Sequence, residues 1–157
     1  MIYKDFTHHF SAIVRKYLFA DKELKDLLLI PAKEQNDIVA FEKRYFCNIL
    51  VESEPLEDRK VMVNYYDGRT VYTDNKDVRL KDIEFDIYVN EKVMYGADED
   101  YMIPRTKLIY ERLKKILCQK QGLEGITFMC TDDFTMMSKA IGYRRYHCIF
   151  QYKKIYG

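Results

Sequence analysis

The stretch DIEFDIYVN, residues 82–90, alternates strictly between two kinds of side chain. Successive side chains of an extended strand point to opposite sides, so each kind occupies its own face. The apolar face carries Ile83, Phe85, Ile87 and Val89. The acidic face carries Asp82, Glu84 and Asp86. This pattern predicts a strand with one face buried against a core and the other face wet or at an interface.

The segments before this strand also indicate extended structure. Residues 45–51 are rich in aromatic and β-branched side chains, and the following segment, which holds Pro55, breaks that run. Residues 61–66 alternate in the same way as 82–90, and residues 70–73 are again β-forming. Asp67-Gly68 lies between those two runs, and this dipeptide favours the type I′ turn of a hairpin. We therefore expect a hairpin that turns at Asp67-Gly68.

Helical patterns lie at the start of the chain and after the strand at 82–90. Near the N-terminus, apolar residues recur at three- and four-residue steps: Phe6, Phe10, Ile13, Val14, Tyr17 and Leu18. Asp21 is placed to cap a second helical segment that Pro31 ends. Pro104 suits the first turn of a helix over residues 104–121, and Gly122 suits its end. The inward stripe of that helix is Leu108, Ile109, Leu113, Ile116 and Leu117.

Two further strands are predicted near the C-terminus, at residues 126–130 and 143–155, with an irregular segment or short extra strand between them. The element order lacks the βαβ alternation of a parallel sheet. It predicts an α+β fold: a mostly antiparallel sheet with a long hairpin, packed by an N-terminal helix and a second helix near 104–121. A length of 157 residues suits a single domain, 1–157, with a sizeable core.

The net charge of +1 argues against a uniformly basic coat for nucleic acid and against an acidic tail. The charge is nevertheless unevenly distributed. Residues 103–157 hold 11 of the 26 basic and 4 of the 25 acidic residues, a net of +7, which leaves −6 for residues 1–102. Two oppositely charged surfaces on one subunit suit a head-to-tail contact between copies, and a basic nucleic-acid surface is the other interpretation.

The four cysteines contain no CxxC pair, so the sequence indicates neither a zinc knuckle nor a thioredoxin-type site. Each lies in an apolar run, where free cysteine behaves as a small hydrophobe. The first residues lack the pattern of a secretory leader, and the longest apolar run is too short for a bilayer span. We expect a soluble, unprocessed protein made in a reducing compartment.

Candidate catalytic groups are few. His8 and His9 are adjacent on the predicted first helix, which does not suit a shared metal ion. His147 and Cys148 are adjacent in a predicted strand, so they point to opposite faces and cannot form a nucleophile–base dyad. For all three histidines, a surface or packed role is the preferred interpretation. We expect no catalytic residue, no cofactor and no metal site.

The acidic row at 82–86 has the residue types of a two-metal site. However, carboxylates two residues apart on a strand lie roughly 7 Å from one another, which is too far for all three to coordinate one ion. The ordinary explanation of this acidic row is a strand face exposed to solvent. The more specific hypothesis is an acidic surface that faces a partner or a channel. The triplets at 58–60 and 74–76 fit the short half of a nuclease motif. In a chain with 32% charged residues such triplets arise by chance.

The order of elements resembles the tail-terminator and tail-completion proteins of tailed bacteriophages. The resemblance covers nearly the whole chain and rests on the leading helix, the long hairpin, the strand at 82–90, the helix at 104–121 and the closing strand after Gly142. Residues 32–60 are its main departure. The resemblance implies a structural neck protein without catalysis, assembled in the host cytoplasm and located in the virion as a ring, usually a hexamer.

As partners, the resemblance implies other copies of the chain, a portal, adaptor or head-closure protein on one side, and the tail tube protein on the other. DNA would pass through the channel without sequence-specific binding. The candidate subunit-interface or channel-facing residues are Asp82, Glu84, Asp86, Asp98, Asp100, Arg112, Lys114 and Lys115. The acidic ones are expected towards the channel and the basic ones towards a neighbour.

Two other classes stay open. One is a different connector, such as a head-closure protein, which shares the ring architecture but has other neighbours. The other is a soluble nucleic-acid-binding or nuclease-like α+β protein that uses the basic C-terminal part of the chain.

Overall fold

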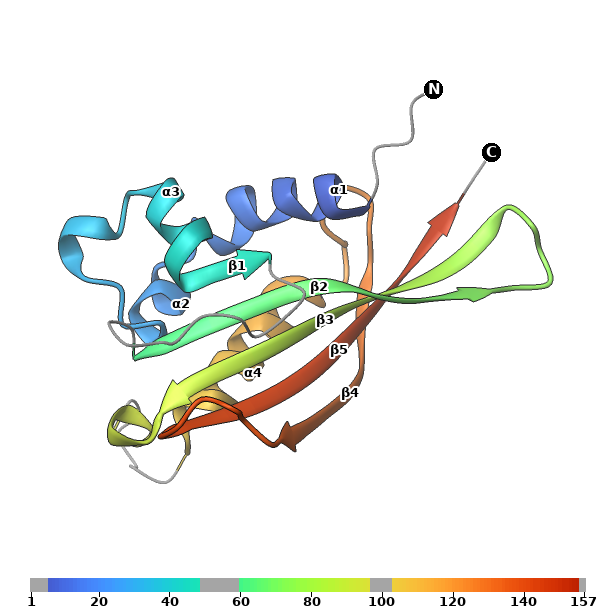
Figure 1. Ribbon diagram of the computed structural model, residues 1–157. Coiled ribbons are helices and arrows are strands. Elements are labelled where there is room, and N and C mark those ends of the chain that lie inside the picture. Colours follow the sequence, from blue (N-terminus) through green and yellow to red (C-terminus); the bar gives the residue numbers. More distant parts are fainter. Residues whose placement is uncertain (1–5, 49–59, 97–102, 156–157) are drawn as a thin grey trace.

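The computed structural model describes residues 6–48, 60–96 and 103–155. Its helical elements are α1 (Phe6–Ile13), the π-helical turn η1 (Val14–Leu18), α2 (Lys22–Leu27), η2 (Ala32–Glu34), α3 (Ile38–Ala40), η3 (Phe41–Tyr45), η4 (Glu91–Val93) and α4 (Arg105–Leu117). Its strands are β1 (Phe46–Asn48), β2 (Val61–Tyr72), β3 (Val78–Asn90), β4 (Phe128–Met136) and β5 (Tyr143–Ile155). Figure 1 shows one twisted sheet with helices behind it.

The sheet has the order β1-β2-β3-β5-β4. β1 pairs with β2 in parallel, and every other pair is antiparallel. The prediction of an α+β fold with a mostly antiparallel sheet is therefore confirmed. Because β5 lies between β3 and β4, the last strand of the chain crosses back to the middle of the sheet. This placement sets β5 residues opposite the acidic row of β3 over the whole length of both strands.

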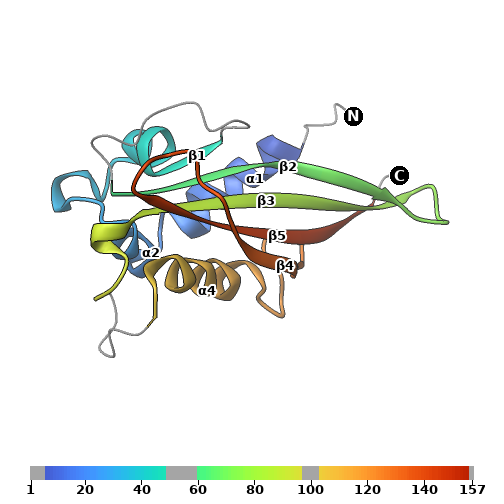
Figure 2. The ribbon, with the colours of Figure 1, turned by 60° about the horizontal axis from the view of Figure 1, so that its bottom comes forward.

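One face of the sheet is covered by helices, and the core lies between them. Figure 2 shows α4 beneath β3 and β5. The predicted apolar face of β3 is buried as expected, and the Phe85 ring lies 5.7 Å from Phe10 of α1 and 5.5 Å from Phe150 of β5, centroid to centroid. On α4, four of the five predicted inward residues are buried, and Leu108 is half-buried. Aromatic edge contacts of this kind stabilise a core beyond the area they bury.

The predicted hairpin turn at Asp67-Gly68 is wrong. β2 continues straight through this dipeptide, and the turn to β3 comes after Tyr72. Asp67 pairs with Ile83 and Thr70 pairs with Lys81, so two residues of β2 lie opposite one residue of β3, which is a β-bulge. Glycine favours bulges as well as turns, and the sequence alone does not distinguish the two.

Two strands are longer than predicted. β3 begins at Val78, and β4 runs to Met136 with an irregularity between Cys130 and Asp132. β1 is shorter than the predicted strand at 45–51, of which the last residues lie outside the described ranges. The α2 cap is as predicted, because the Asp21 carboxylate accepts a hydrogen bond from the Leu24 amide at 2.8 Å.

The bulge and the longer strands create a projecting arm, residues 69–81 together with the end of β5. Figure 1 shows this arm extending beyond the helices. Val78 pairs with Ile155, so three strands continue into the arm. Tyr72 near its tip is 71% exposed, with the Arg79 guanidinium 4.8 Å from its ring centroid.

Candidate functional site

The face of the sheet opposite the helices carries a charge network centred on Asp86. Arg145 donates two hydrogen bonds to this carboxylate, from Nε to Oδ1 at 2.7 Å and from Nη2 to Oδ2 at 3.0 Å. His147 Nδ1 lies 2.8 Å from Oδ1, and the Tyr66 hydroxyl donates to Oδ2 at 3.1 Å. Asp86 is only 4% exposed. Its burial is tolerated because each oxygen accepts two hydrogen bonds, most of them from charged groups.

His147 links Asp86 to Glu84. Its Nε2 lies 2.9 Å from Glu84 Oε1, so the ring bridges two carboxylates through its two nitrogens. The Phe134 ring from β4 lies 5.2 Å from the imidazole, centroid to centroid. Cross-strand pairing explains this geometry, since Asp86 is the partner of His147 in the β3–β5 register.

The third carboxylate of the row, Asp82, has its own partners. Arg69 from the bulge donates from Nε to Oδ2 at 2.9 Å, and Gln151 of β5 donates to Oδ1 at 3.0 Å. Gly68 of the bulge is packed against the same row: a Cβ added there would lie 2.6 Å from Glu84 Oε2 and 2.9 Å from Asp82 Cβ. The bulge therefore brings Arg69 next to Asp82. Position 68 must be glycine because a larger side chain there would overlap the acidic row.

Burial and charge act on the pKa values of this network in opposite directions. For His147, burial alone lowers the pKa, but the hydrogen bonds and charges of Asp86 and Glu84 outweigh it and the pKa is raised. For Asp86, burial alone raises the pKa, but hydrogen bonds from His147 and Arg145 outweigh it and the pKa is lowered. Both shifts favour the ionised pair, a carboxylate facing an imidazolium.

The network is close to neutral as a whole, because three carboxylates face two guanidinium groups and one histidine held towards its charged form. A histidine with both nitrogens on carboxylates is a poor general base, because it has no free lone pair to accept a proton. Across residues 6–48, 60–96 and 103–155, no three His, Cys, Asp or Glu side chains are arranged to hold a metal ion. The arrangement is suited to holding strands together and to presenting a polar but nearly uncharged face.

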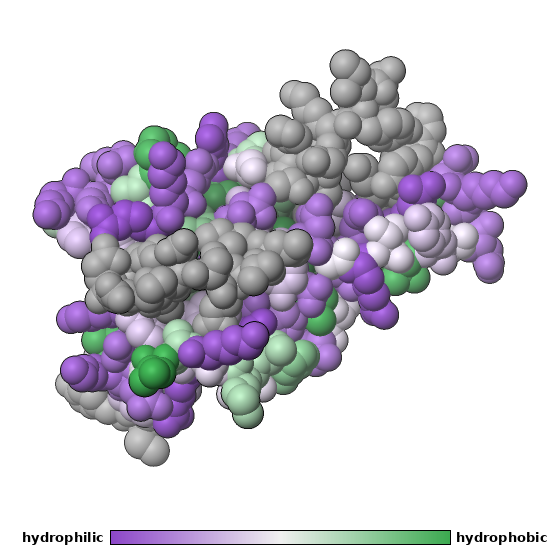
Figure 3. All heavy atoms as spheres, viewed as in Figure 1, coloured by the Kyte–Doolittle hydropathy of each residue, from purple (hydrophilic) through white to green (hydrophobic). Residues whose placement is uncertain are grey.

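Apolar side chains flank the network on this face. Cys47, Met62 and Tyr88 form a small buried cluster on β1, β2 and β3, with Tyr143 packed against it. Figure 3 shows this face as a mixture of hydrophilic and hydrophobic residues, with the hydrophobic ones in several separate places.

The basic candidates on α4 differ in how they are used. Arg112 binds Asp21 with Nε at 3.0 Å and Nη2 at 2.5 Å, and Glu23 with Nη1 at 2.7 Å, so it fastens α4 to the start of α2. Its hydrogen bonds, despite burial, lower the pKa of Asp21. Lys114 and Lys115 are exposed and remain available to a partner. Asp98 and Asp100 lie outside the described residues.

The expected separation of His147 and Cys148 is confirmed. His147 lies on the face of the sheet opposite the helices, which we call the open face. Cys148 is fully buried in the core beneath the helices, where burial raises the pKa of its thiol. In the described part of the chain each helix is too short or too polar for a membrane span.

Four side chains that pair with the acidic row were not anticipated from sequence: Arg69, Arg145, His147 and Gln151. The sequence carried a signal for three of them, since positions 145, 147 and 151 share one face of the predicted last strand. Placing that strand beside residues 82–90 would have set them against the acidic row. No family model matches the chain, and no curated protein matches it.

Proposed function

We propose that this chain is a structural subunit that assembles as a ring in the neck of a tailed bacteriophage, as a tail terminator or head–tail joining protein. The proposal rests on the order of elements and on one structural observation, the projecting arm. An arm of three paired strands that extends past its own helices buries little of its surface within one subunit. Its exposed surface is available for contact with a neighbouring subunit.

The open face supports an assembly role over catalysis. Its titratable groups are engaged with one another, Asp86 by Arg145 and His147, and Asp82 by Arg69 and Gln151. A catalytic acid or base needs a proton-transfer position directed at a substrate, whereas these groups are saturated by internal hydrogen bonds. The saturation gives a rigid, polar surface of low net charge, along which DNA or a neighbouring layer can lie without strong attraction.

The test is the assembly state of the purified chain. Sedimentation velocity and negative-stain imaging at micromolar concentration are expected to give a closed ring with a central opening. In assembled virions, the partners on the two flat sides of the ring are expected to be a head-side connector and the tail tube protein. A chain that stays monomeric across this concentration range contradicts the proposal.

A second candidate, nucleic-acid binding, is favoured by the charge of the arm. Its described side chains comprise two acidic groups, Asp74 and Asp77, and five basic ones: Arg69, Lys76, Arg79, Lys81 and Lys153. Basic side chains of this kind contact the phosphates of DNA. Fluorescence anisotropy with a labelled duplex at 50 and 200 mM salt separates the candidates, because binding through phosphates falls steeply with salt. The variant Lys76→Glu with Lys153→Glu must then lose the binding.

A further inference from the structure

The two ring nitrogens of His147 both lie at hydrogen-bond distance from carboxylate oxygens. Nδ1 is 2.8 Å from Asp86 Oδ1, and Nε2 is 2.9 Å from Glu84 Oε1. An ionised carboxylate only accepts hydrogen bonds, so each of these nitrogens must donate, and only the imidazolium carries a proton on both. With both carboxylates ionised, the geometry therefore corresponds to the charged form of His147, which histidine loses near neutral pH.

The two carboxylates differ in how firmly they are held. The Asp86 side chain is 5% exposed and accepts three further hydrogen bonds, two from Arg145 and one from Tyr66. The Glu84 side chain is 24% exposed, and within the described ranges His147 is its only hydrogen-bond or ion-pair partner. Loss of a hydrogen bond costs most at a buried charge that water cannot reach. Glu84 can therefore exchange His147 for water, whereas Asp86 cannot.

The other charged groups on β2, β3 and β5 near His147 are already engaged. β2 contributes Tyr66, whose hydroxyl donates to Asp86 and whose ring lies 6.4 Å from the imidazole, centroid to centroid. β5 contributes Arg145, which is bound to the same carboxylate. Further along β3, Asp82 is bound by a guanidinium of its own. None of these groups replaces the hydrogen bond between His147 and Glu84.

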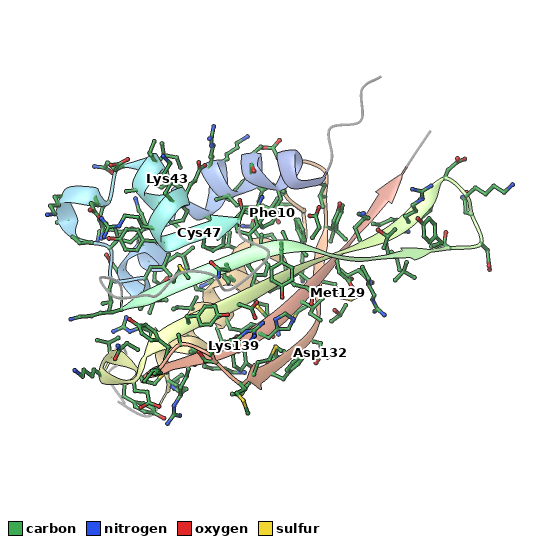
Figure 4. All side chains as sticks on the ribbon, viewed as in Figure 1. Phe10, Lys43, Cys47, Met129, Asp132 and Lys139 are labelled. Carbon is green, nitrogen blue, oxygen red and sulfur yellow. The ribbon has the colours of Figure 1, made fainter. Side chains whose placement is uncertain are left out.

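β4 covers the remaining side of His147 with an apolar ring. Phe134 pairs with His147 in the β4–β5 register, and the two ring centroids are 5.2 Å apart. The charged residue of β4 on the same face, Asp132, is exposed and pairs with Ile149. Figure 4 shows Asp132 on β4, the last strand in the sheet order. β4 therefore supplies no second acceptor for the imidazole ring.

We propose that His147 is a pH-sensitive switch on the open face. The protonated ring holds both carboxylates. When Nε2 loses its proton to the solvent, Nδ1 keeps its proton on Asp86, and Glu84 is released to water. Three carboxylates of the network then face only two guanidinium groups, so its net charge changes from zero to −1. The released carboxylate also moves away from Gly68 of the bulge, against which it packs.

The electrostatics of the site agree with this geometry. Burial lowers the pKa of His147, but the hydrogen bonds and charges of Asp86 and Glu84 outweigh it, so the pKa is raised. The proton is therefore lost above the ordinary histidine value of about 6.5. A partner on the open face meets an uncharged network at lower pH and a negative one at higher pH, so contact with an anionic surface weakens as the pH rises. The switch lies within one chain and is independent of the proposed ring.

The first test needs no substitution in the chain that is measured. Nitrogen NMR of the isotopically labelled full chain reports which ring nitrogens carry a proton, from about pH 5 to about pH 9. The signals of His147 are assigned by their absence in His147→Gln. We expect both nitrogens to be protonated at low pH and one proton to be lost with a midpoint above about 6.5. The proton that remains is expected on Nδ1.

The second test removes the charge of the released partner and keeps its shape. Glu84→Gln is expected to lower the midpoint of His147 by about one pH unit, because one of the two charges that stabilise the imidazolium is lost. Glu111→Gln is the matched control, since it neutralises an exposed carboxylate on α4, on the other side of the sheet. It is expected to leave the midpoint unchanged. Amide spectra of both variants check that they are folded.

Several results would overturn the switch. A remaining proton on Nε2 would mean that Asp86 is released instead of Glu84, and a ring that stays doubly protonated up to about pH 9 would mean that neither is released. A midpoint at or below about 6.5 would mean that the two carboxylates do not hold the proton. If Glu84→Gln and Glu111→Gln shift the midpoint equally, or if neither shifts it, Glu84 is not the group that the proton holds.

Discussion

On the helix-covered face of β3, Phe85 is enclosed by aromatic rings, whereas on the open face its neighbour Asp86 is enclosed by hydrogen-bond donors. Both side chains are nearly inaccessible to water. Phe85 is held by apolar contact, which is non-directional and tolerates small shifts. Asp86 is held by four hydrogen bonds whose loss leaves buried charges unpaired. Phe85 and Asp86 are therefore buried to a similar extent, but the stability of the fold depends on them in different ways. We expect it to respond differently to mutation and to pH on the two faces.

The largest effect is expected on the helix-covered face. Phe85→Ala removes a ring at the centre of the core and leaves a cavity, so the free energy of unfolding should fall by about 3–5 kcal/mol. Urea unfolding measures the change. The control is Phe134→Ala, which truncates the same side chain at an exposed position and should change stability by less than about 1 kcal/mol.

On the open face, Asp86→Asn keeps the shape of the side chain but removes its charge. Arg145 and His147 then lose their buried counter-charge, and the expected cost is about 3 kcal/mol. Urea unfolding of a triple variant sharpens the comparison. Asp86→Leu, Arg145→Leu and His147→Leu together should cost less than Asp86→Asn alone, because the one carboxylate that loses its partner, Glu84, is partly exposed to water. A triple variant that is much less stable than the single one would mean that the network contributes strongly favourable energy of its own.

A smaller effect is expected at the bulge. Gly68→Ala places a methyl group against Glu84 and Asp82, and relief of that overlap requires the acidic row to move. Steric overlap of this kind costs about 1–3 kcal/mol, measured by thermal unfolding. Gly125→Ala is unsuitable as a control because the backbone φ of Gly125 is positive, so Thr127→Ala, at an exposed site, is used instead. If Gly68→Ala is neutral, the bulge adapts and Arg69 is not tightly held.

The smallest effect is a dependence of stability on pH. The pKa of His147 is raised in the folded chain, so its contribution is fully present below the ordinary histidine pKa of about 6.5 and is lost as pH rises through the raised value. The free energy of unfolding should therefore decline above about pH 6.5, and His147→Gln should remove that decline. A decline that persists in the variant would belong to another group.

The strand at 82–90 and its two faces were predictable because alternation along one strand is a local property of the sequence. The helix at 104–121 was predictable for the same reason, with Pro104 and Gly122 near its ends. The bulge at Asp67-Gly68 was not, because the glycine signal is shared by turns and bulges. The sequence places Arg145 and His147 on one face of the last strand, but it does not show that they pair with Asp86. They meet Asp86 only through the β3–β5 register.

The interface candidates show the same limit. Helical spacing predicted which residues of α4 are on its outer side, but not that Arg112 would be engaged by Asp21 across 91 residues. Exposed apolar residues such as Ile141 leave no local pattern in the sequence, because an apolar residue in a loop is ordinary.

The bulge between Asp67 and Thr70 has a consequence for how this protein can change over time. Beyond it, the register between β2 and β3 is shifted by one residue, and Thr70 lies opposite Lys81. Residues can therefore be gained or lost in matched pairs at the tip without disturbing a single contact of the core. The length of the arm can therefore change without a change in the fold. A longer or shorter arm would contact a partner at a different distance from the body of the subunit.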